Sequence, residues 1–96
     1  MNTKEYSPQP IDTSDIQLSQ ELEQLVEQLV ENVHEVWAKN RMDQEWHYGR
    51  IRDDVKKTHP YIVQYNDLPE SEKGYDQNTS IETIKLILKL GFKISI

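Results

Sequence analysis

The sequence predicts a small, mostly α-helical domain in which two long antiparallel amphipathic helices are bridged by a long irregular segment with short helical turns. Apolar residues recur at helical spacing in 22–37 and again in 75–90, and capping signals flank both stretches. Between them, residues 40–65 follow neither helical nor strand periodicity. A chain of 96 residues holds one core, so we expect an N-terminal arm over 1–18 and a single domain over 19–96.

Residues 1–18 have the composition of an irregular arm. Pro8, Pro10 and the polar run 12–15 favour extended and turn geometry. Four apolar side chains are candidate anchors: Tyr6, Ile11, Ile16 and Leu18. Two interpretations stay open, namely a tail without contacts and an arm that lies across the core through those four side chains.

The first helix is expected to begin after Ser19, because its hydroxyl is suited to accept from backbone amides of the first turn. One apolar stripe follows, formed by Leu22, Leu25, Val26, Leu29, Val30, Val33 and Trp37. The opposite face carries Glu21, Glu27, Gln28, Glu31 and Glu35. We interpret it as a solvated acidic face.

The segment 40–65 mixes aromatic residues, bases and turn-forming residues without clean alternation. We expect a long connection with short helical turns. Irregular stretches of this length are uncommon inside compact domains, and where they occur they are often functional. The segment is therefore the first place to look for a site.

A second helix is predicted from Pro69, which suits the first helical position and is followed by acidic residues. Its apolar face consists of Tyr75, Ile81, Ile84, Ile87 and Leu88. Gly74 weakens the middle and 79–82 has capping-box spacing, so two shorter helices are the alternative to the continuous helix that we favour. Gly91 is a natural residue for the C-terminal turn after Leu90, and an extended tail follows.

The net charge of −6 is unevenly distributed. Residues 1–36 hold one lysine and eight carboxylates, whereas 37–60 hold six bases and four acids. An acidic chain is a poor binder of duplex nucleic acid, because such binding depends on Lys and Arg neutralising phosphates. The middle segment still suits one compact anion.

The sequence also indicates in which cellular compartment the protein is expected. The chain has no cysteine for a disulfide or a thiolate metal site. No apolar run approaches the roughly 18–20 residues that span a bilayer, and the N-terminus lacks the pattern of a secretory signal. We expect a cytoplasmic protein without a membrane partner.

Catalytic motifs are absent from the sequence, which has no glycine-rich phosphate loop, no nucleophile elbow and no thiol. We expect no enzyme, no cofactor and no metal. Glu31 and His34 have the spacing of di-iron helix bundles, but such sites need a second motif and two further carboxylates. We interpret His34 as packed beside Trp37 or bonded to the neighbouring loop, and His59 with Pro60 is readable as a structural turn.

Ligand recognition is better supported. The candidate contacts are Trp37, Arg41, Trp46, Tyr48, Arg52 and His59. Aromatic faces stack planar rings, and guanidinium groups grip phosphate or carboxylate through paired donors. In the structural alternative, which spacing alone favours, Trp37 belongs to the core and the pairs Arg41–Asp43 and Arg52–Asp53 brace the loop.

Six motifs occur in order along the chain: ENVHEVWAKNR from Glu31, WHYG from Trp46, RDD from Arg52, KTHP from Lys57, LPESEK from Leu68 and ETIKLILKLGF from Glu82. Together they resemble the RyR domain, a repeat found in tandem in the cytoplasmic assembly of animal ryanodine receptors and as a stand-alone or fused domain in bacteria. The similarity runs from about Ile11 to Ile96. The opening 10–14 looks like the bacterial stand-alone form, which suggests a microbial protein.

The resemblance implies a mostly helical, non-enzymatic domain. It also implies a small-molecule site, because a tandem pair in the channel resembles a clamp that holds adenine nucleotide, lined by a Trp and an Arg that match Trp37 and Arg41. Calcium conduction is not implied, since these repeats lie remote from the pore. A single repeat lacks its tandem partner, so the resemblance suggests a homodimer, most simply a twofold one. The expected function is a nucleotide-like sensing or interaction module, and the alternative is a purely structural or protein-docking domain.

Three positions depart from the family pattern. Glu45 stands where Gly is usual before the second Trp, Arg50 stands where Pro is common, and Gln77 replaces a frequent Arg. The carboxylate of Glu45 is expected to weaken binding of a polyanion near the site, and Arg50 is expected to compensate.

Overall fold

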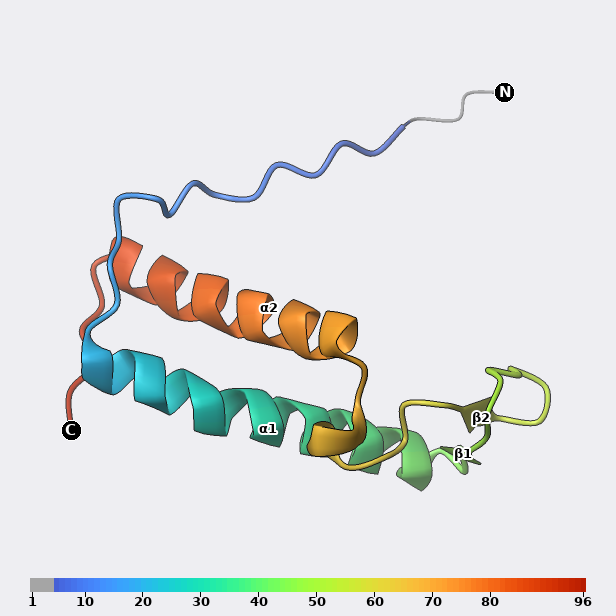
Figure 1. Cartoon of the computed structure of the whole chain (residues 1–96). Coiled ribbons are helices and arrows are strands. Elements are labelled where there is room, and N and C mark those ends of the chain that lie inside the picture. Colours follow the sequence, from blue (N-terminus) through green and yellow to red (C-terminus); the bar gives the residue numbers. More distant parts are fainter. Residues whose placement is uncertain (1–4) are drawn as a thin grey trace.

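Two helices dominate the structure, a computed structural model that describes residues 5–96. Helix α1 spans Gln20–Asp43 and α2 spans Glu70–Lys89; between them come β1 (His47–Tyr48), β2 (Thr58–His59) and the 3-10 turn η1 (Tyr65–Asp67). Figure 1 shows α2 running back along α1 in the opposite direction, while the segment with β1 and β2 extends beyond the end of α1. The predicted mostly helical fold class is confirmed. Within residues 5–96, neither helix has the length and apolar character of a membrane span.

Helix α1 begins where the capping signal predicts. The Ser19 hydroxyl accepts from the Leu22 amide at 3.2 Å, which satisfies one of the backbone donors left open in the first turn. The helix continues to Asp43, so the prediction that helical order is lost at residue 40 is wrong. Arg41 continues the inner side of the helix one turn after Trp37, and a count of apolar residues cannot register an arginine at such a position.

A left-handed residue terminates α1. The Glu45 amide donates to the Met42 carbonyl and the Trp46 amide to the Arg41 carbonyl, each at 3.0 Å, which is the pattern of a Schellman motif. The motif needs a residue with positive φ, and φ is 72° at Glu45. Because only glycine adopts this conformation without a Cβ penalty, Glu45 carries backbone strain.

Helix α2 is continuous. Pro69 is its N-cap residue, and the helix begins at Glu70, one residue later than predicted. It passes through Gly74 without a break, so the prediction of one helix is confirmed and the alternative of two shorter helices is wrong. A Cβ placed on Gly74 would meet no atom within 4 Å, so packing does not require glycine there.

The end of α2 repeats the motif that ends α1. The Gly91 amide donates to the Leu88 carbonyl at 3.1 Å and the Phe92 amide to the Ile87 carbonyl at 3.3 Å. Gly91 has φ 97°, which confirms its predicted role in the C-terminal turn. Here the left-handed position is occupied by the residue best suited to it.

The core lies between α1 and α2. Val26, Val30 and Ile84 are buried, and the partly buried side chains around them are Leu18, Leu22, Leu29, Tyr65, Ile81 and Leu88. Leu25 and Val33, two members of the predicted apolar stripe, are 40% and 44% exposed. The predicted stripe is therefore only partly buried, because a single helix packed against α1 buries a narrower strip than the apolar count suggests.

Two short strands order part of the segment predicted to be irregular. β1 and β2 pair in parallel, with His47 opposite Thr58 and Tyr48 opposite His59. Strands of two residues leave no room for the alternation by which a sequence predicts a strand. Within residues 5–96, η1 represents the short helical turns that were expected there.

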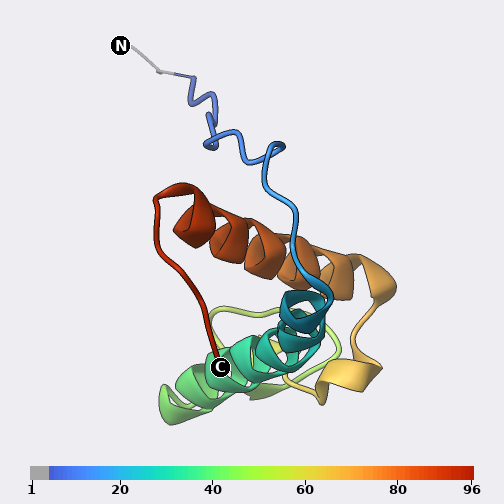
Figure 2. The same cartoon turned by 90° about the vertical axis from the view of Figure 1, so that its left-hand side faces the viewer.

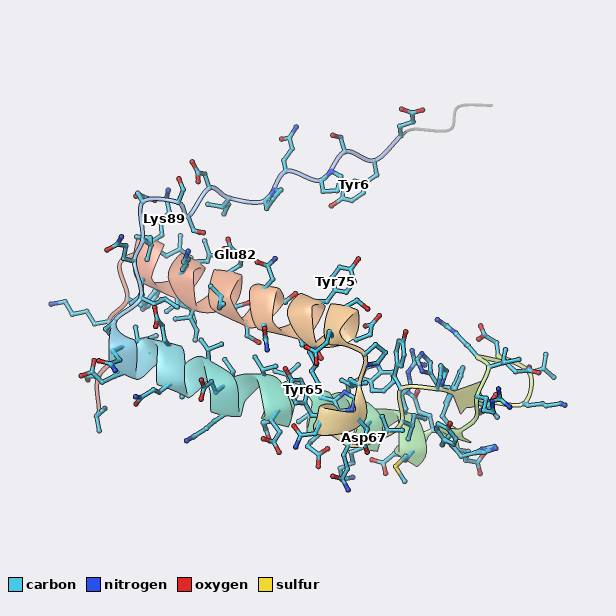
Figure 3. The ribbon with its side chains drawn as sticks, in the orientation of Figure 1. Tyr6, Tyr65, Asp67, Tyr75, Glu82 and Lys89 are labelled. Atoms are coloured by element: carbon cyan, nitrogen blue, oxygen red, sulfur yellow. The ribbon has the colours of Figure 1, made fainter. Side chains whose placement is uncertain are left out.

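Polar contacts hold the arm on α2. Thr13 is buried, and its hydroxyl donates to the Glu82 carboxylate at 2.6 Å. The Lys89 ammonium donates to the Asp12 carbonyl and, at 3.1 Å, to the Asp15 carboxylate. Figure 3 shows Glu82 and Lys89 projecting from α2 towards the arm.

Of the four apolar side chains predicted as candidate anchors of the arm, two are partly buried and two are exposed. Ile16 and Leu18 are partly buried, but Tyr6 and Ile11 are 85% and 55% exposed. The polar turn 12–15 secures the arm to α2 in place of those two side chains. At the other end of the chain, the segment after Gly91 returns to the start of α1 (Figure 2), where Ile94 lines a shallow hollow.

Candidate functional site

A cavity of about 360 Å³ opens between the C-terminal half of α1, the segment around β2 and the first turns of α2. Four of the six predicted site residues line it: Trp37, Arg41, Arg52 and His59. Trp46 lies behind them in contact with Arg41 and His59. Tyr48 is 53% exposed and does not line this cavity.

Arg41 lies between two indole rings. Its guanidinium carbon is 4.9 Å from the ring centroid of Trp46 and 5.7 Å from that of Trp37, within the range of a cation–π contact. Trp37 and Arg41 share one face of α1 because they are four residues apart. Within residues 5–96 no salt bridge engages Arg41, so its N–H groups are free to hold an anion.

The two ion pairs that the structural alternative proposed do not form. Asp43 pairs with Lys39 at 2.8 Å, one turn away on α1, and Arg52 donates through Nε to Asp54 at 3.0 Å. Both observed pairs are exposed, so they contribute little to stability. Asp53 does not pair with Arg52, because its carboxylate accepts hydrogen bonds from backbone amides of the local turn.

His34 fixes the position of Trp37. It is 4% exposed, and its Nε2 lies 2.7 Å from the Val63 carbonyl, to which it donates. Its ring stacks on Trp37 with centroids 5.7 Å apart and an interplanar angle of 22°. The prediction that His34 packs beside Trp37 or bonds to the neighbouring loop is confirmed on both counts, and the Val63 bond ties that loop to α1.

His59 is a neutral donor at the cavity. Its Nδ1 accepts from the Tyr61 amide at 3.0 Å, so the ring proton resides on Nε2. Burial lowers the pKa of His59 below its usual value, and the positive charges of Arg52 and Arg41 lower it further. The ring meets Trp37 edge-on at 5.1 Å, and the turn with Pro60 follows as predicted.

Asp53 shapes the loop that carries Arg52. Its carboxylate accepts from the Val55 and Lys56 amides at 2.9 and 3.0 Å, and the hydrogen bond from the Lys56 backbone holds the pKa of this carboxyl below its usual value. Asp53 and Thr58 also exchange two backbone hydrogen bonds of 3.0 Å. The loop is therefore a defined turn rather than a free connection.

Gly49 allows β1 to approach β2. A Cβ at this position would lie 2.5 Å from the Thr58 Cβ, which is closer than packing tolerates. The glycine thus sets how near the loop comes to β2, on which His59 lies.

Two carboxylates on α2 complete the cavity, and the sequence reasoning missed them. Glu72 and Asp76 line the cavity together with Arg41 and Arg52, and the charge of Glu72 raises the pKa of His59 against the larger effects that lower it. Their spacing of four residues near the start of a helix was the signal available, but it did not reveal that they line the same cavity as Arg41 and Arg52. The cavity therefore holds two positive and two negative side chains.

A metal site is not formed by the described residues. Within 5–96 no group of three His, Asp or Glu side chains is arranged to hold a metal ion. His34, the histidine of the Glu-x-x-His motif, is bonded to a backbone carbonyl instead. The cavity offers rings, N–H donors and carboxylates, which suit a polar organic ligand.

The comparison with known families agrees with the order of the motifs. The family model described as the RyR domain matches residues 6–96, which takes in both helices, the loop and most of the arm. The RyR domain is a non-enzymatic domain family. The chain belongs to the RyR domain family.

Proposed function

We propose that this protein is a non-catalytic module that binds a nucleotide-like small molecule in the cavity between α1, β2 and α2. The observation that carries the proposal is the arrangement of Arg41, which lies between Trp37 and Trp46 with no salt bridge among residues 5–96. An unpaired guanidinium beside aromatic rings is suited to a ligand with a planar ring and a phosphate.

Each wall of the cavity has a role in this proposal. Arg41 and Arg52 bind the phosphate oxygens, and the neutral His59 adds an N–H donor from Nε2. Glu72 and Asp76 accept from amino or hydroxyl groups at the other end of the ligand. Because these carboxylates repel additional phosphates, a single phosphate suits the cavity better than a triphosphate.

Calorimetric titration with AMP, ADP and ATP tests the proposal. We expect saturable binding, with AMP held at least as tightly as ATP. Arg41→Ala removes charged hydrogen bonds worth about 1.5–3 kcal/mol, so its affinity is expected to fall by roughly tenfold or more. Lys39→Ala is the matched control, since it removes the same charge from an exposed position on the same helix.

Absence of heat and of any thermal shift with these nucleotides at millimolar concentration would remove the nucleotide proposal, because a bound ligand must stabilise the native state. The alternative function, a structural or protein-docking domain, is supported by the way Arg41 joins α1 to Trp46. It predicts that Arg41→Ala lowers the melting temperature markedly while nucleotides have no effect on either protein.

The twofold homodimer that a paired-repeat clamp would require stays a prediction, as does a bacterial, cytoplasmic setting. Sedimentation velocity with and without AMP tests the dimer. A shift from one copy to two on addition of AMP would support a site completed by a second copy.

A further inference from the structure

Two carboxylates line the candidate-site cavity from α2. Glu72 and Asp76 are half-buried there, and within residues 5–96 neither takes part in a salt bridge. Lys73, the base next to Glu72 in the sequence, pairs with Glu70 at 3.5 Å instead. Both carboxylates are therefore available to accept hydrogen bonds from a ligand.

The groups that bind a polar ligand in this cavity divide by element into donors and acceptors. Arg41 of α1 and Arg52 of the loop after β1 have N–H groups only, and the His59 ring of β2 keeps its proton on Nε2. The charged groups from α2 are carboxylates, which accept hydrogen bonds and do not donate them when ionised. A ligand that reaches from α1 to α2 is therefore required to present acceptors to α1 and donors to α2.

Electrostatics orients a nucleotide in such a cavity. A phosphate is attracted by the two guanidinium groups and repelled by the two carboxylates. The Watson–Crick edge of the base is the part of a nucleotide that lies farthest from a 5′-phosphate. Glu72 and Asp76 are one helical turn apart on the same face of α2, so they are placed to read that edge together.

The common bases differ in what this edge offers to a carboxylate. Guanine presents two adjacent donors, N1–H and the 2-amino group. Adenine and cytosine present one amino group beside an unprotonated ring nitrogen, whose lone pair a carboxylate repels, and uracil presents one N–H between two carbonyl oxygens. Guanine is therefore the base that best matches side chains which only accept.

We infer that Glu72 and Asp76 select guanine, so that the ligand of this cavity is a guanine nucleotide with a single phosphate. The inference rests on the proposed function, because it takes a nucleotide with its phosphate at Arg41 and Arg52 as given. It adds a base specificity and assigns that specificity to α2. One carboxylate that accepts from N1–H and the 2-amino group together makes the same kind of paired, charge-assisted contact that arginine makes with a phosphate.

Calorimetric titration of the full chain with GMP, IMP and AMP tests the inference. IMP is GMP without the 2-amino group, so this pair isolates one donor. Because a hydrogen bond to a charged group contributes strongly, we expect GMP to bind roughly tenfold or more tightly than IMP. AMP is expected to bind most weakly of the three, since it lacks N1–H as well.

Glu72→Gln and Asp76→Asn keep the shape of each side chain and replace one acceptor oxygen with a donor group. Removing a negative charge strengthens the binding of any phosphate, so the readout is the ratio of the AMP and GMP dissociation constants. We expect each variant to lower this ratio and the double variant to abolish the discrimination. Glu70→Gln is the matched control, because it removes the same charge from a 91% exposed side chain of α2 outside the cavity lining, and it is expected to keep the ratio.

Three results would overturn the inference, and they separate it from the proposed function. Saturable binding of AMP with GMP held no more tightly removes the guanine specificity and leaves the proposed function intact. Equal losses of GMP and AMP affinity in Glu72→Gln, together with weak binding of 2′-deoxy-GMP to the natural sequence, would assign the carboxylates to the ribose hydroxyls. Absence of binding by all three nucleotides at millimolar concentration removes the proposed function and the inference with it.

Discussion

Two clusters of side chains connect the parts of this protein, and their chemistry differs. The aliphatic cluster of Val26, Val30 and Ile84 buries C–H groups between α1 and α2. The aromatic cluster joins α1 to the segment after it and is formed by Trp37, Arg41, Trp46, His59 and Tyr61. The first consists of buried aliphatic side chains, whereas the second borders the candidate-site cavity with rings and N–H donors. If the proposed ligand binding occurs in that cavity, it depends on residues other than the aliphatic cluster, and single substitutions separate the two properties.

The largest effect is expected in the aliphatic cluster. Ile84 is 3% exposed, and Ile84→Ala is expected to reduce the free energy of unfolding by about 3 kcal/mol through lost burial and an unfilled cavity. For a domain of this size the melting temperature then falls by roughly 12–24 °C. Nucleotide affinity, measured below the melting temperature, is expected to stay unchanged.

Ile87 provides the control for that substitution. It has the same chemistry on the same helix but is 38% exposed, so Ile87→Ala is expected to cost well under half as much in urea unfolding. Equal costs for the two substitutions would break the comparison, because they would place the core elsewhere on α2.

In the aromatic cluster, Arg41→Lys separates charge from shape. Lysine keeps the positive charge but loses the planar group that lies between Trp37 and Trp46. We expect the affinity for AMP to fall roughly tenfold, or about 1.4 kcal/mol, with a smaller loss of stability. Full retention of affinity in calorimetry would show that charge alone matters at this position.

The two helix ends sharpen the comparison further, because the same motif holds glutamate in one and glycine in the other. Glu45→Gly relieves the left-handed strain next to the aromatic cluster and is expected to raise the free energy of unfolding by up to about 1 kcal/mol. The converse change, Gly91→Ala, places a Cβ at φ 97° and is expected to destabilise by a similar amount. Thermal unfolding checks both variants: the melting temperature is expected to rise in Glu45→Gly and to fall in Gly91→Ala.

The smallest effect is a pH dependence from the aromatic cluster. Because the pKa of His59 is lower in the folded protein than in the unfolded chain, the unfolded state binds more protons below about pH 6.5. Stability is therefore expected to fall as the pH drops from about 6.5 through the lowered value. Urea midpoints across this range should slope less in His59→Gln, and the exposed His47 gives a control in which the slope persists.

Local signals explain which parts of the molecule the sequence predicts. The cap at Ser19 and the turn at Gly91 depend on residues within one helical turn, so both were predictable. Trp37 and Arg41 could be paired because helical spacing alone puts them on one face. The motifs named the family for the same reason, since they are continuous stretches of sequence.

The remaining features depend on contacts between distant segments. Glu72 and Asp76 join the cavity only because the start of α2 packs beside the end of α1, and Thr13 is buried through a partner 69 positions away. The spacing of apolar residues along the sequence does not predict such contacts between distant segments. Arg52 pairs with Asp54 and not with Asp53. The Asp53 carboxylate already accepts hydrogen bonds from two backbone amides, and only the geometry of the turn reveals this.

The parallel pairing of β1 and β2 has a consequence for local opening. Parallel strands are ordinarily connected by a dozen or more residues, but here residues 49–57 suffice, so the pair closes within one short stretch of chain. The His47 amide donates to the Lys57 carbonyl and the Gly49 amide donates to the His59 carbonyl, and neither bond involves α2. Hydrogen–deuterium exchange should therefore find these amides opening together while the amides of α1 near Val30 stay protected, and a ligand held by Arg52 and His59 should slow that shared opening.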